Sequence, residues 1–175
     1  DRQGIAYIQC TLGKTPAHAE RGEAPLFVGG DQQAIAGLAE VWPVLGVFNN
    51  VGTVEAACAV KLVSNLVGMA NLAVLSEGLR IGEAAGVEKN LLLQLLGETG
   101  AHSFQLDARG KSMAQREYDP PRFALDLALK DLRLGCGMAH GMNVDVPLLD
   151  MVFARFGRST SAGLGKKDCA AVHEI

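Results

Sequence analysis

The stretch GTVEAACAVKLVSN, residues 52–65, decides the fold of this chain. A glycine and a threonine open it, and small and apolar residues then follow without proline, which is typical of the start of a helix. The same pattern continues downstream and predicts one long helix over residues 53–85, ended by Gly86 as its C-cap. Because this helix is apolar on nearly all sides, other helices or a second subunit must cover it.

Lys61 and Asn65 lie one turn apart inside this apolar helix, so the ammonium and the amide can face one ligand. An ammonium is costly to bury, and lysines in such settings have easily shifted pKa values and serve as acids or bases. Two structural alternatives stay open. Lys61 could place its stem on the core and its head in water, and Asn65 could form a hydrogen bond between helices.

Upstream of residue 52 the pattern predicts strands, and downstream it predicts helices. Strands are expected at residues 4–10, 25–30 and 46–50, with a short helix at residues 32–41 capped by Asp31. Three strands and one short helix are too few to close a nucleotide-binding domain. Further helices are expected at residues 88–96, 103–116 with Ser103 as N-cap, 123–140, 146–156 and 167–174.

The composition indicates a compact globular protein. Hydrophobic residues make up 49% and charged residues 20% of the 175 residues, which argues against disorder. The net charge of −3 and the pI of about 5.8 give no reason to expect nucleic acid or an anionic membrane as a partner. The longest apolar run, residues 67–75, is broken by Asn71, so no membrane span is expected. We also expect no signal peptide.

Metal and disulfide frameworks are not expected either. The four cysteines are far apart in sequence and form no Cys-x-x-Cys pair, which favours buried free thiols in a reducing cytoplasm. The four histidines have no ligand-type partner at i+3 or i+4, so the sequence predicts no metal site.

Gly13-Lys14-Thr15 looks like the end of the phosphate-binding P-loop motif. That motif requires a glycine where Ile8 stands, and a helix after the threonine, whereas Pro16 follows here. We therefore reject a nucleoside triphosphate site.

Three motifs in order resemble the β-hydroxyacid dehydrogenases, the family that includes 3-hydroxyisobutyrate dehydrogenase and tartronate semialdehyde reductase. The first is Gly52 with Lys61-x-x-x-Asn65 opening the long helix. The second is FALDLALKDL, residues 123–132, which is similar to the family's Phe…Lys-Asp-Leu segment. The third is GLGKKD, residues 163–168, with Pro147 between the last two as in the family. The resemblance covers nearly the whole chain.

This resemblance implies a mainly α fold. Residues 52–175 would form an all-helical substrate and dimerisation domain like the C-terminal domain of 6-phosphogluconate dehydrogenase. Residues 1–51 would be the last strands of a Rossmann-type NAD(P)-binding domain. Because no Gly-x-Gly-x-x-Gly follows a strand, the chain is expected to be the C-terminal part of a longer enzyme, inactive by itself.

The resemblance also implies roles for individual residues. Lys61 would be the general acid and base, and Asn65 would hydrogen-bond the carboxylate or hydroxyl of the substrate. Lys130 would approach the nicotinamide, with Asp131 positioning its helix. Phe123 would pack near the cofactor, with a plain core role as the alternative. Asp168 could close the site, although two neighbouring lysines indicate an exposed turn.

The family's substrate loop, commonly Asp-Ala-Pro-Val-Ser-Gly-Gly, corresponds to residues 9–15 here. QCTLGKT lacks the serine and the second glycine, which puts the usual small 3-hydroxy acid in doubt. Gly13, Lys14 and Thr15 would then bind an anionic or polyhydroxylated acid.

The expected function is hydride transfer with NAD or NADP between a small 3-hydroxy acid and its semialdehyde or keto form, in a cytoplasmic homo-oligomer. Two alternatives stay open: an imine-reducing relative, and a catalytically inactive helical dimerisation module.

Overall fold

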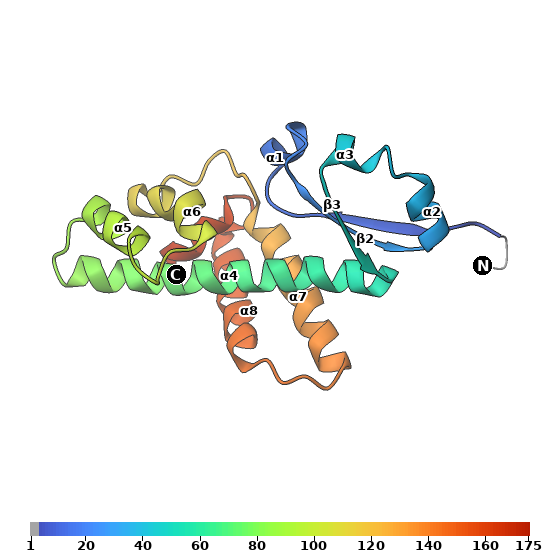
Figure 1. Ribbon diagram of the computed structural model, residues 1–175. Helices are drawn as coiled ribbons and strands as arrows, with labels where there is room; N and C mark the ends of the chain where they lie inside the picture. The colour runs from blue at the N-terminus through green and yellow to red at the C-terminus, as the bar shows by residue number, and fades with distance from the viewer. Residues whose placement is uncertain (1–3) are drawn as a thin grey trace. The chain divides into compact units, whose positions relative to one another are not determined.

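The computed structural model of the protein describes residues 4–175, and these fall into two compact units (Figure 1). The first unit extends to Ser64 and the second runs from Asn65 to Ile175, so the division falls inside the long helix α4 (Val54–Ala84). The domain border predicted between residues 51 and 52 lies just before α4 begins and stays a prediction.

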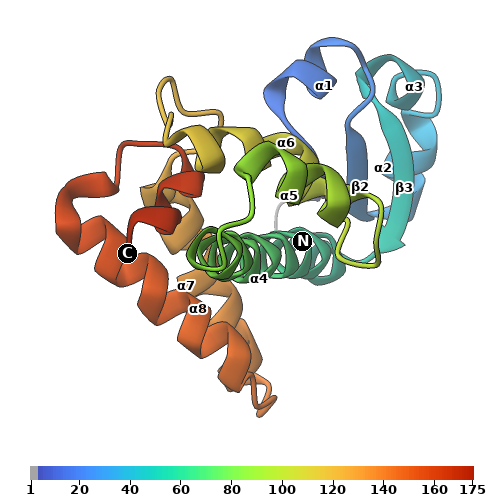
Figure 2. The ribbon, with the colours of Figure 1, turned by 90° about the vertical axis from the view of Figure 1, so that its left-hand side faces the viewer.

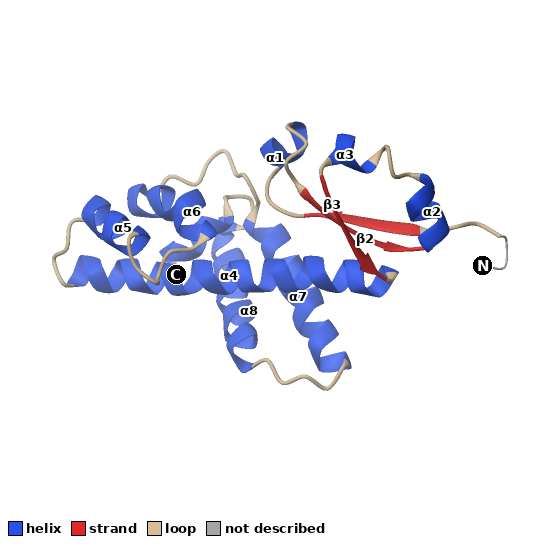
Figure 3. Cartoon of the chain, viewed as in Figure 1, coloured by secondary structure: helices blue, strands red, loops and turns tan. Residues whose placement is uncertain are grey.

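The first unit is built on a sheet with the strand order β1 (Ile8–Leu12), β2 (Pro25–Gly30) and β3 (Val47–Gly52), drawn in red in Figure 3. β2 runs antiparallel to β1 and parallel to β3. Three short helices connect the strands: α1 (Pro16–Glu20), α2 (Gln32–Gly37) and α3 (Trp42–Leu45). The small core of this unit consists of Leu26, Val28, Ile35 and Trp42.

The sequence predicted β2 correctly but misplaced its neighbours. The first strand was expected at residues 4–10, yet it begins at Ile8, because Ile8 pairs with Gly30, where β2 ends. The helix predicted over residues 32–41 ends at Gly37, and a new helix begins at Trp42 with Pro43 in its first turn, where a missing N–H costs little. The expectation that no helix follows Thr15 was also wrong. Pro16 opens α1, because the first turn of a helix does not need its N–H group.

The second unit is helical. Besides α4 it contains α5 (Lys89–Gly97), α6 (Phe104–Gln115), α7 (Leu125–Gly141) and α8 (Pro147–Ser159), followed by η1 (Thr160–Leu164) and the 3₁₀ helix η2 (Cys169–Glu174). Figure 2 looks along α4 and shows α5 and α6 on one side of it and α7 and α8 on the other. Leu72, Leu125, Leu132, Phe156 and Val172 are completely buried between these helices. The fold is thus mainly α, as the sequence predicted.

The helix ends are capped largely as predicted, by a side chain at the start of α6 and by a glycine after α4. Ser103 Oγ accepts a hydrogen bond from the Leu106 N–H at 3.2 Å, and Gly86 follows α4 with a φ of +79°. The helix predicted from residue 167 begins instead at Cys169. Asp168 has extended backbone angles and caps this helix by accepting from the Ala170 N–H, so it cannot lie inside it.

Among the described residues, α4 is the one helix that is long and apolar enough to cross a membrane, with a mean hydropathy of 1.6. Core helices of soluble proteins meet the same two conditions, so this is weak evidence for a membrane span.

Candidate functional site

The start of α4 is fixed by close contacts inside the first unit. A Cβ on Gly29 would collide with the carbonyl oxygen of Thr53, so a glycine is needed where β2 approaches the helix. Thr11 Oγ1, at the end of β1, donates to the carbonyl oxygen of Ala57 at 3.0 Å. These contacts set the position of the helix turn that precedes Lys61, which is half-buried.

The predicted substrate loop follows β1 directly. Gly13 is buried and its N–H donates to the Pro25 carbonyl at 2.9 Å, which ties the loop to the start of β2. Lys14 is exposed and has a φ of +59°, an unusual angle for a residue with a side chain. Thr15 Oγ1 lies 2.8 Å from Nδ1 of His18. The loop therefore presents one ammonium, while the Thr15 hydroxyl already has a partner.

Asn65, Lys130 and Asp131 form what we call the Asn65 cluster, which lies within the second unit. Asn65 Nδ2 donates to Asp131 Oδ2 at 2.6 Å, and Lys130 Nζ lies 2.9 Å from Asp131 Oδ1. The Asp131 residue is 9% exposed, whereas the Lys130 side chain is 50% exposed. One buried carboxylate thus holds two predicted site residues from different helices.

Close packing of α4 on α7 maintains this contact. Gly135 lies one turn after Asp131, and a Cβ there would come within 2.6 Å of Leu66, the residue that follows Asn65. Neither the contact between Asp131 and Asn65 nor the role of Gly135 was foreseen from the sequence. The signal was present in the Lys-Asp pair, but the partner lies 66 residues away in sequence.

Phe123 is half-buried and packs against the core of the second unit. Its carbonyl oxygen accepts a hydrogen bond from the Cys169 N–H at 2.9 Å, so the backbone here is fixed by the C-terminal segment. This placement fits the plain core role that was the alternative, and its contact with a cofactor stays a prediction.

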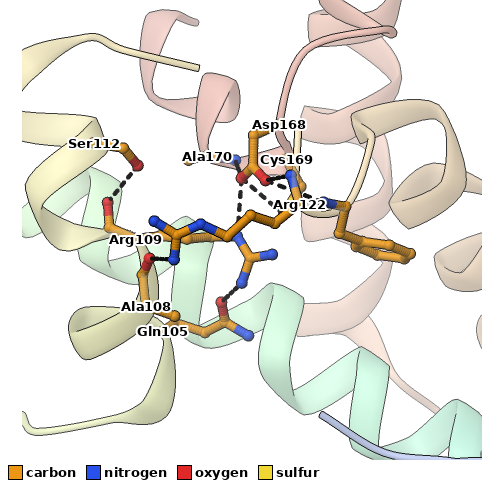
Figure 4. A network of polar contacts seen from close by, with 9 residues as sticks. Gln105, Ala108, Arg109, Ser112, Arg122, Asp168, Cys169 and Ala170 are labelled. Atoms are coloured by element: carbon orange, nitrogen blue, oxygen red, sulfur yellow. Dashed lines mark hydrogen bonds and ion pairs between the residues drawn. The ribbon is translucent and has the colours of Figure 1, made fainter. Parts of the chain in front are cut away.

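Gln105, Arg109 and Asp168 form the Arg109 cluster, shown in Figure 4. Arg109 Nε donates to Asp168 Oδ1 at 2.9 Å and Arg109 Nη1 donates to Gln105 Oε1 at 2.8 Å. The other carboxylate oxygen of Asp168 accepts from the backbone N–H groups of Arg122 and Phe123. Arg109 and Asp168 are each 5% exposed, so Asp168 itself is not part of an exposed surface, although the neighbouring Lys166 lies in an exposed turn as expected.

This environment changes the acidity of Asp168. Burial by itself would raise the pKa of its carboxyl, but the charge of Arg109 and the backbone N–H donors outweigh burial and hold that pKa below its usual value. Asp168 therefore stays ionised and joins the segment before α7 to the C-terminal segment, which is a structural role.

Neither metal ligands nor disulfides occur among the described residues: no group of three or more His, Cys, Asp or Glu side chains could hold a metal ion, and the four cysteines are free. Cys136 and Cys169 are buried, and burial raises the pKa of Cys169 to about 12. Cys58 is exposed, so the expectation of buried thiols was wrong for that residue.

Comparisons with known proteins point to one family. The family profile described as "NAD-binding of NADP-dependent 3-hydroxyisobutyrate dehydrogenase" matches residues 56–175. A curated relative, 2-(hydroxymethyl)glutarate dehydrogenase of Eubacterium barkeri, is 28% identical over 99% of this chain and 58% of its own length. The chain thus spans little more than half of that relative.

Solved structures share the fold. A 3-hydroxyisobutyrate dehydrogenase from Salmonella typhimurium superposes with a TM-score of 0.92 at 22% identity, covering 99% of this chain and 61% of that one. Psf3 in complex with NADP+ and 2-OPP superposes with a TM-score of 0.85 at 19% identity, again covering 99% and 61%. Because the family profile matches well over half of the chain, this protein belongs to the 3-hydroxyisobutyrate dehydrogenase family of β-hydroxyacid dehydrogenases.

Proposed function

We propose that this chain is part of an NAD(P)-dependent oxidoreductase that interconverts a small 3-hydroxy acid and its semialdehyde or keto form. The observation that carries the proposal is the family match over residues 56–175, a stretch that contains Lys61 and the whole Asn65 cluster. The named relative is a dehydrogenase of a hydroxymethyl dicarboxylic acid, which agrees with this reaction class.

Lys61 is proposed as the general acid and base. In the reducing direction its ammonium donates a proton to the carbonyl oxygen of the substrate, and in the oxidising direction the amine takes the proton back. An ammonium beside the reacting oxygen also stabilises the negative charge that develops there. Asn65, one turn further along α4, would hold the substrate by a hydrogen bond.

The residues present fit the nicotinamide end of a dinucleotide. Lys130 is half-exposed and shares a single carboxylate, so it retains N–H groups for a carboxamide or a ribose hydroxyl. The sequence contains no glycine-rich turn for the pyrophosphate, which upstream residues would have to supply. When bound, the nicotinamide supplies or accepts the hydride. The structural neighbour Psf3 binds NADP+, which supports the same class of cofactor here.

Lys14 of the predicted loop is proposed to bind the acid end of the substrate, because the Gly13 N–H and the Thr15 hydroxyl already have partners within the protein. The exposed ammonium of Lys14 can pair with a carboxylate, and a dicarboxylic substrate would offer it one. The loop lacks the serine that is common in this family, so we expect an additional anionic group on the substrate to replace that contact.

We also propose that the protein forms a homo-oligomer in the cytoplasm. Val67, Val74 and Ile81 repeat along one side of α4 and are 54%, 68% and 70% exposed. Apolar side chains in such a row gain stability when a second subunit covers them. Sedimentation of a strictly monomeric protein would contradict this part of the proposal.

The experiment that tests the reaction compares the wild type with Lys61→Ala in the full-length protein. Absorbance of NADH and NADPH is followed with a panel of small semialdehydes and keto acids. We expect turnover to fall by about two to four orders of magnitude, the usual contribution of a general acid, with little change in cofactor binding.

Lys111→Ala, which removes an exposed ammonium from α6, serves as the matched control and should keep the wild-type rate. A near-normal rate for Lys61→Ala would exclude Lys61 as the acid. Turnover of imines but not of carbonyl compounds would favour the imine-reducing alternative, and no turnover at all would favour the inactive module.

A further inference from the structure

His173 is a buried histidine that the proposed reaction does not use. It lies in η2 and is 4% exposed, and its Nδ1 atom lies 3.2 Å from the hydroxyl oxygen of Ser76, which is completely buried in α4. The same hydroxyl oxygen accepts a hydrogen bond at 3.0 Å from Nη2 of Arg155, on α8. One serine hydroxyl therefore joins three elements of the second unit.

The shared hydroxyl favours the neutral form of His173. A guanidinium can only donate, so the Ser76 oxygen accepts from Arg155, and the hydroxyl proton stays available for an unprotonated Nδ1. A protonated ring would instead place a second cation beside the hydroxyl that already binds a guanidinium, in a buried region where charge is poorly solvated. Burial is the main cause that lowers the pKa of His173.

Other charges around His173 come from several elements and act in both directions. The carboxylates of Glu174 in η2 and Glu83 in α4 raise its pKa, while the guanidinium groups of Arg116, after α6, and Arg80, in α4, lower it. Histidine is the side-chain type whose ordinary pKa lies between pH 5 and pH 8. Between pH 7 and pH 5 we therefore assign the change of charge in this region to His173.

The segment that carries His173 also holds the chain in front of α7. The Cys169 N–H donates to the Phe123 carbonyl oxygen, and the Leu125 N–H donates to the Lys167 carbonyl oxygen, both at 2.9 Å. Residues 169–172 are completely buried. Opening of η2 would expose these residues to water and loosen the start of α7.

We propose that η2 is a pH-sensitive clasp, in which protonation of His173 breaks its contact with Ser76 and lets residues 169–174 detach while the longer helices stay folded. The open segment can carry a hydrated imidazolium, whereas the closed segment favours the neutral ring. At pH 5 the equilibrium constant for opening can rise by up to about thirtyfold, because the ordinary histidine pKa of about 6.5 applies to the open form. The clasp would operate whether or not the protein catalyses the proposed reaction.

Cys169 lies inside the clasp, so the reactivity of its thiol measures opening. Full-length wild-type protein receives short pulses of a dipyridyl disulfide, which labels thiols in acid as well as in neutral solution, and peptide mass spectrometry quantifies each labelled cysteine. The rate at each pH is divided by that of a short cysteine peptide in the same buffer. We expect this relative rate for Cys169 to rise about ten- to thirtyfold between pH 7 and pH 5.

Cys136 in the same sample distinguishes local opening from global unfolding. It is 4% exposed and lies in α7, outside the clasp, so its relative rate should stay unchanged. In His173→Gln, whose side chain cannot be protonated, Cys169 should lose its pH dependence, while His102→Gln, at an exposed histidine, should follow the wild type. Equal acceleration of both thiols, a constant Cys169 rate, or pH dependence retained in His173→Gln would each overturn the clasp.

Ser76→Ala tests the contact without altering the titrating group. Loss of the hydroxyl removes the contact that closes the clasp, so Cys169 should react faster than in the wild type at pH 7 and gain less toward pH 5. Ser112→Ala is the matched control, because its hydroxyl donates to the Arg109 carbonyl oxygen within α6 and should leave the rate unchanged. Wild-type rates at both pH values in Ser76→Ala would overturn the role of the shared hydroxyl.

Discussion

The carboxylates of Asp131 and Asp168 are both buried in the second unit, but their partners differ. Asp168 is enclosed by Arg109, which is equally buried, and by three backbone N–H groups. Asp131 holds Asn65 and the half-exposed Lys130. Asp168 contacts a buried guanidinium and backbone groups, whereas Asp131 contacts two residues that the family motifs assign to the site. The first should therefore govern stability and the second activity.

The largest effect is expected when the buried ion pair of Arg109 and Asp168 is broken. Arg109→Met leaves Asp168 buried without its cation, and loss of one partner of a buried pair costs about 3–5 kcal/mol in the free energy of unfolding. Urea unfolding measures this loss, and Arg21→Met, which opens the exposed Arg21–Glu23 pair, is the control with no resolvable change. A loss equal to that of the control would show that the Arg109 cluster does not stabilise the fold.

The pH dependence of the same pair has a defined sign. The folded-state pKa of Asp168 lies below its usual value. Its contribution to the free energy of unfolding is therefore fully present above about pH 4. That contribution is lost as the pH falls through the folded-state pKa, and Asp168→Asn should flatten this part of the acid unfolding curve.

A smaller effect on stability is expected from a substitution at the contact between α4 and α7, which holds Asp131 beside Asn65. Gly135→Ala places a methyl group against Leu66 and should cost about 1–3 kcal/mol in the free energy of unfolding. Gly137→Ala, on the same helix, meets nothing within 4 Å and should stabilise the protein by up to about 1 kcal/mol, as alanine favours helices. Calorimetric unfolding of the two variants checks this, and equal shifts would contradict the packing argument.

The smallest effect concerns another enclosed group, His173, which contacts Ser76 Oγ at 3.2 Å. Burial lowers its pKa, and the charges of neighbouring carboxylates and guanidinium groups act in both directions. The folded protein therefore favours the neutral ring. The contribution of His173 to the free energy of unfolding is fully present above about pH 6.5, and it is lost as the pH falls toward the lower folded-state pKa. Thermal unfolding of His173→Gln should vary less between pH 7 and pH 5, while His102→Gln, on the surface, should follow the wild type.

The sequence predicted the helices well because their signals are local. Ser103 and Gly86 occur where a helix must begin or end, and apolar periodicity marks what lies between. Strand β1 was misplaced because its limits depend on where its partner β2 ends. Pro16 was taken as evidence against a following helix, although proline also opens helices.

For the site, sequence reasoning found residues but not their contacts. Lys61, Asn65 and Lys130 were identified through short motifs, yet the contact between Asn65 and Asp131 joins residues 66 positions apart. Asp168 was judged by its charged neighbours in sequence, although in three dimensions it faces Arg109 from α6. Pairings of this kind depend on how the helices pack, and no local pattern encodes them.

The most direct test of the account measures unfolding free energy and kcat/KM together for Asp131→Asn and Asp168→Asn. We predict that Asp168→Asn lowers stability, while its kcat/KM stays near the wild-type value under conditions where it remains folded. We predict the reverse for Asp131→Asn, with near-normal stability and kcat/KM reduced about ten- to hundredfold. Equal losses of stability in both variants, with no separate loss of kcat/KM for Asp131→Asn, would contradict the distinction between the two carboxylates.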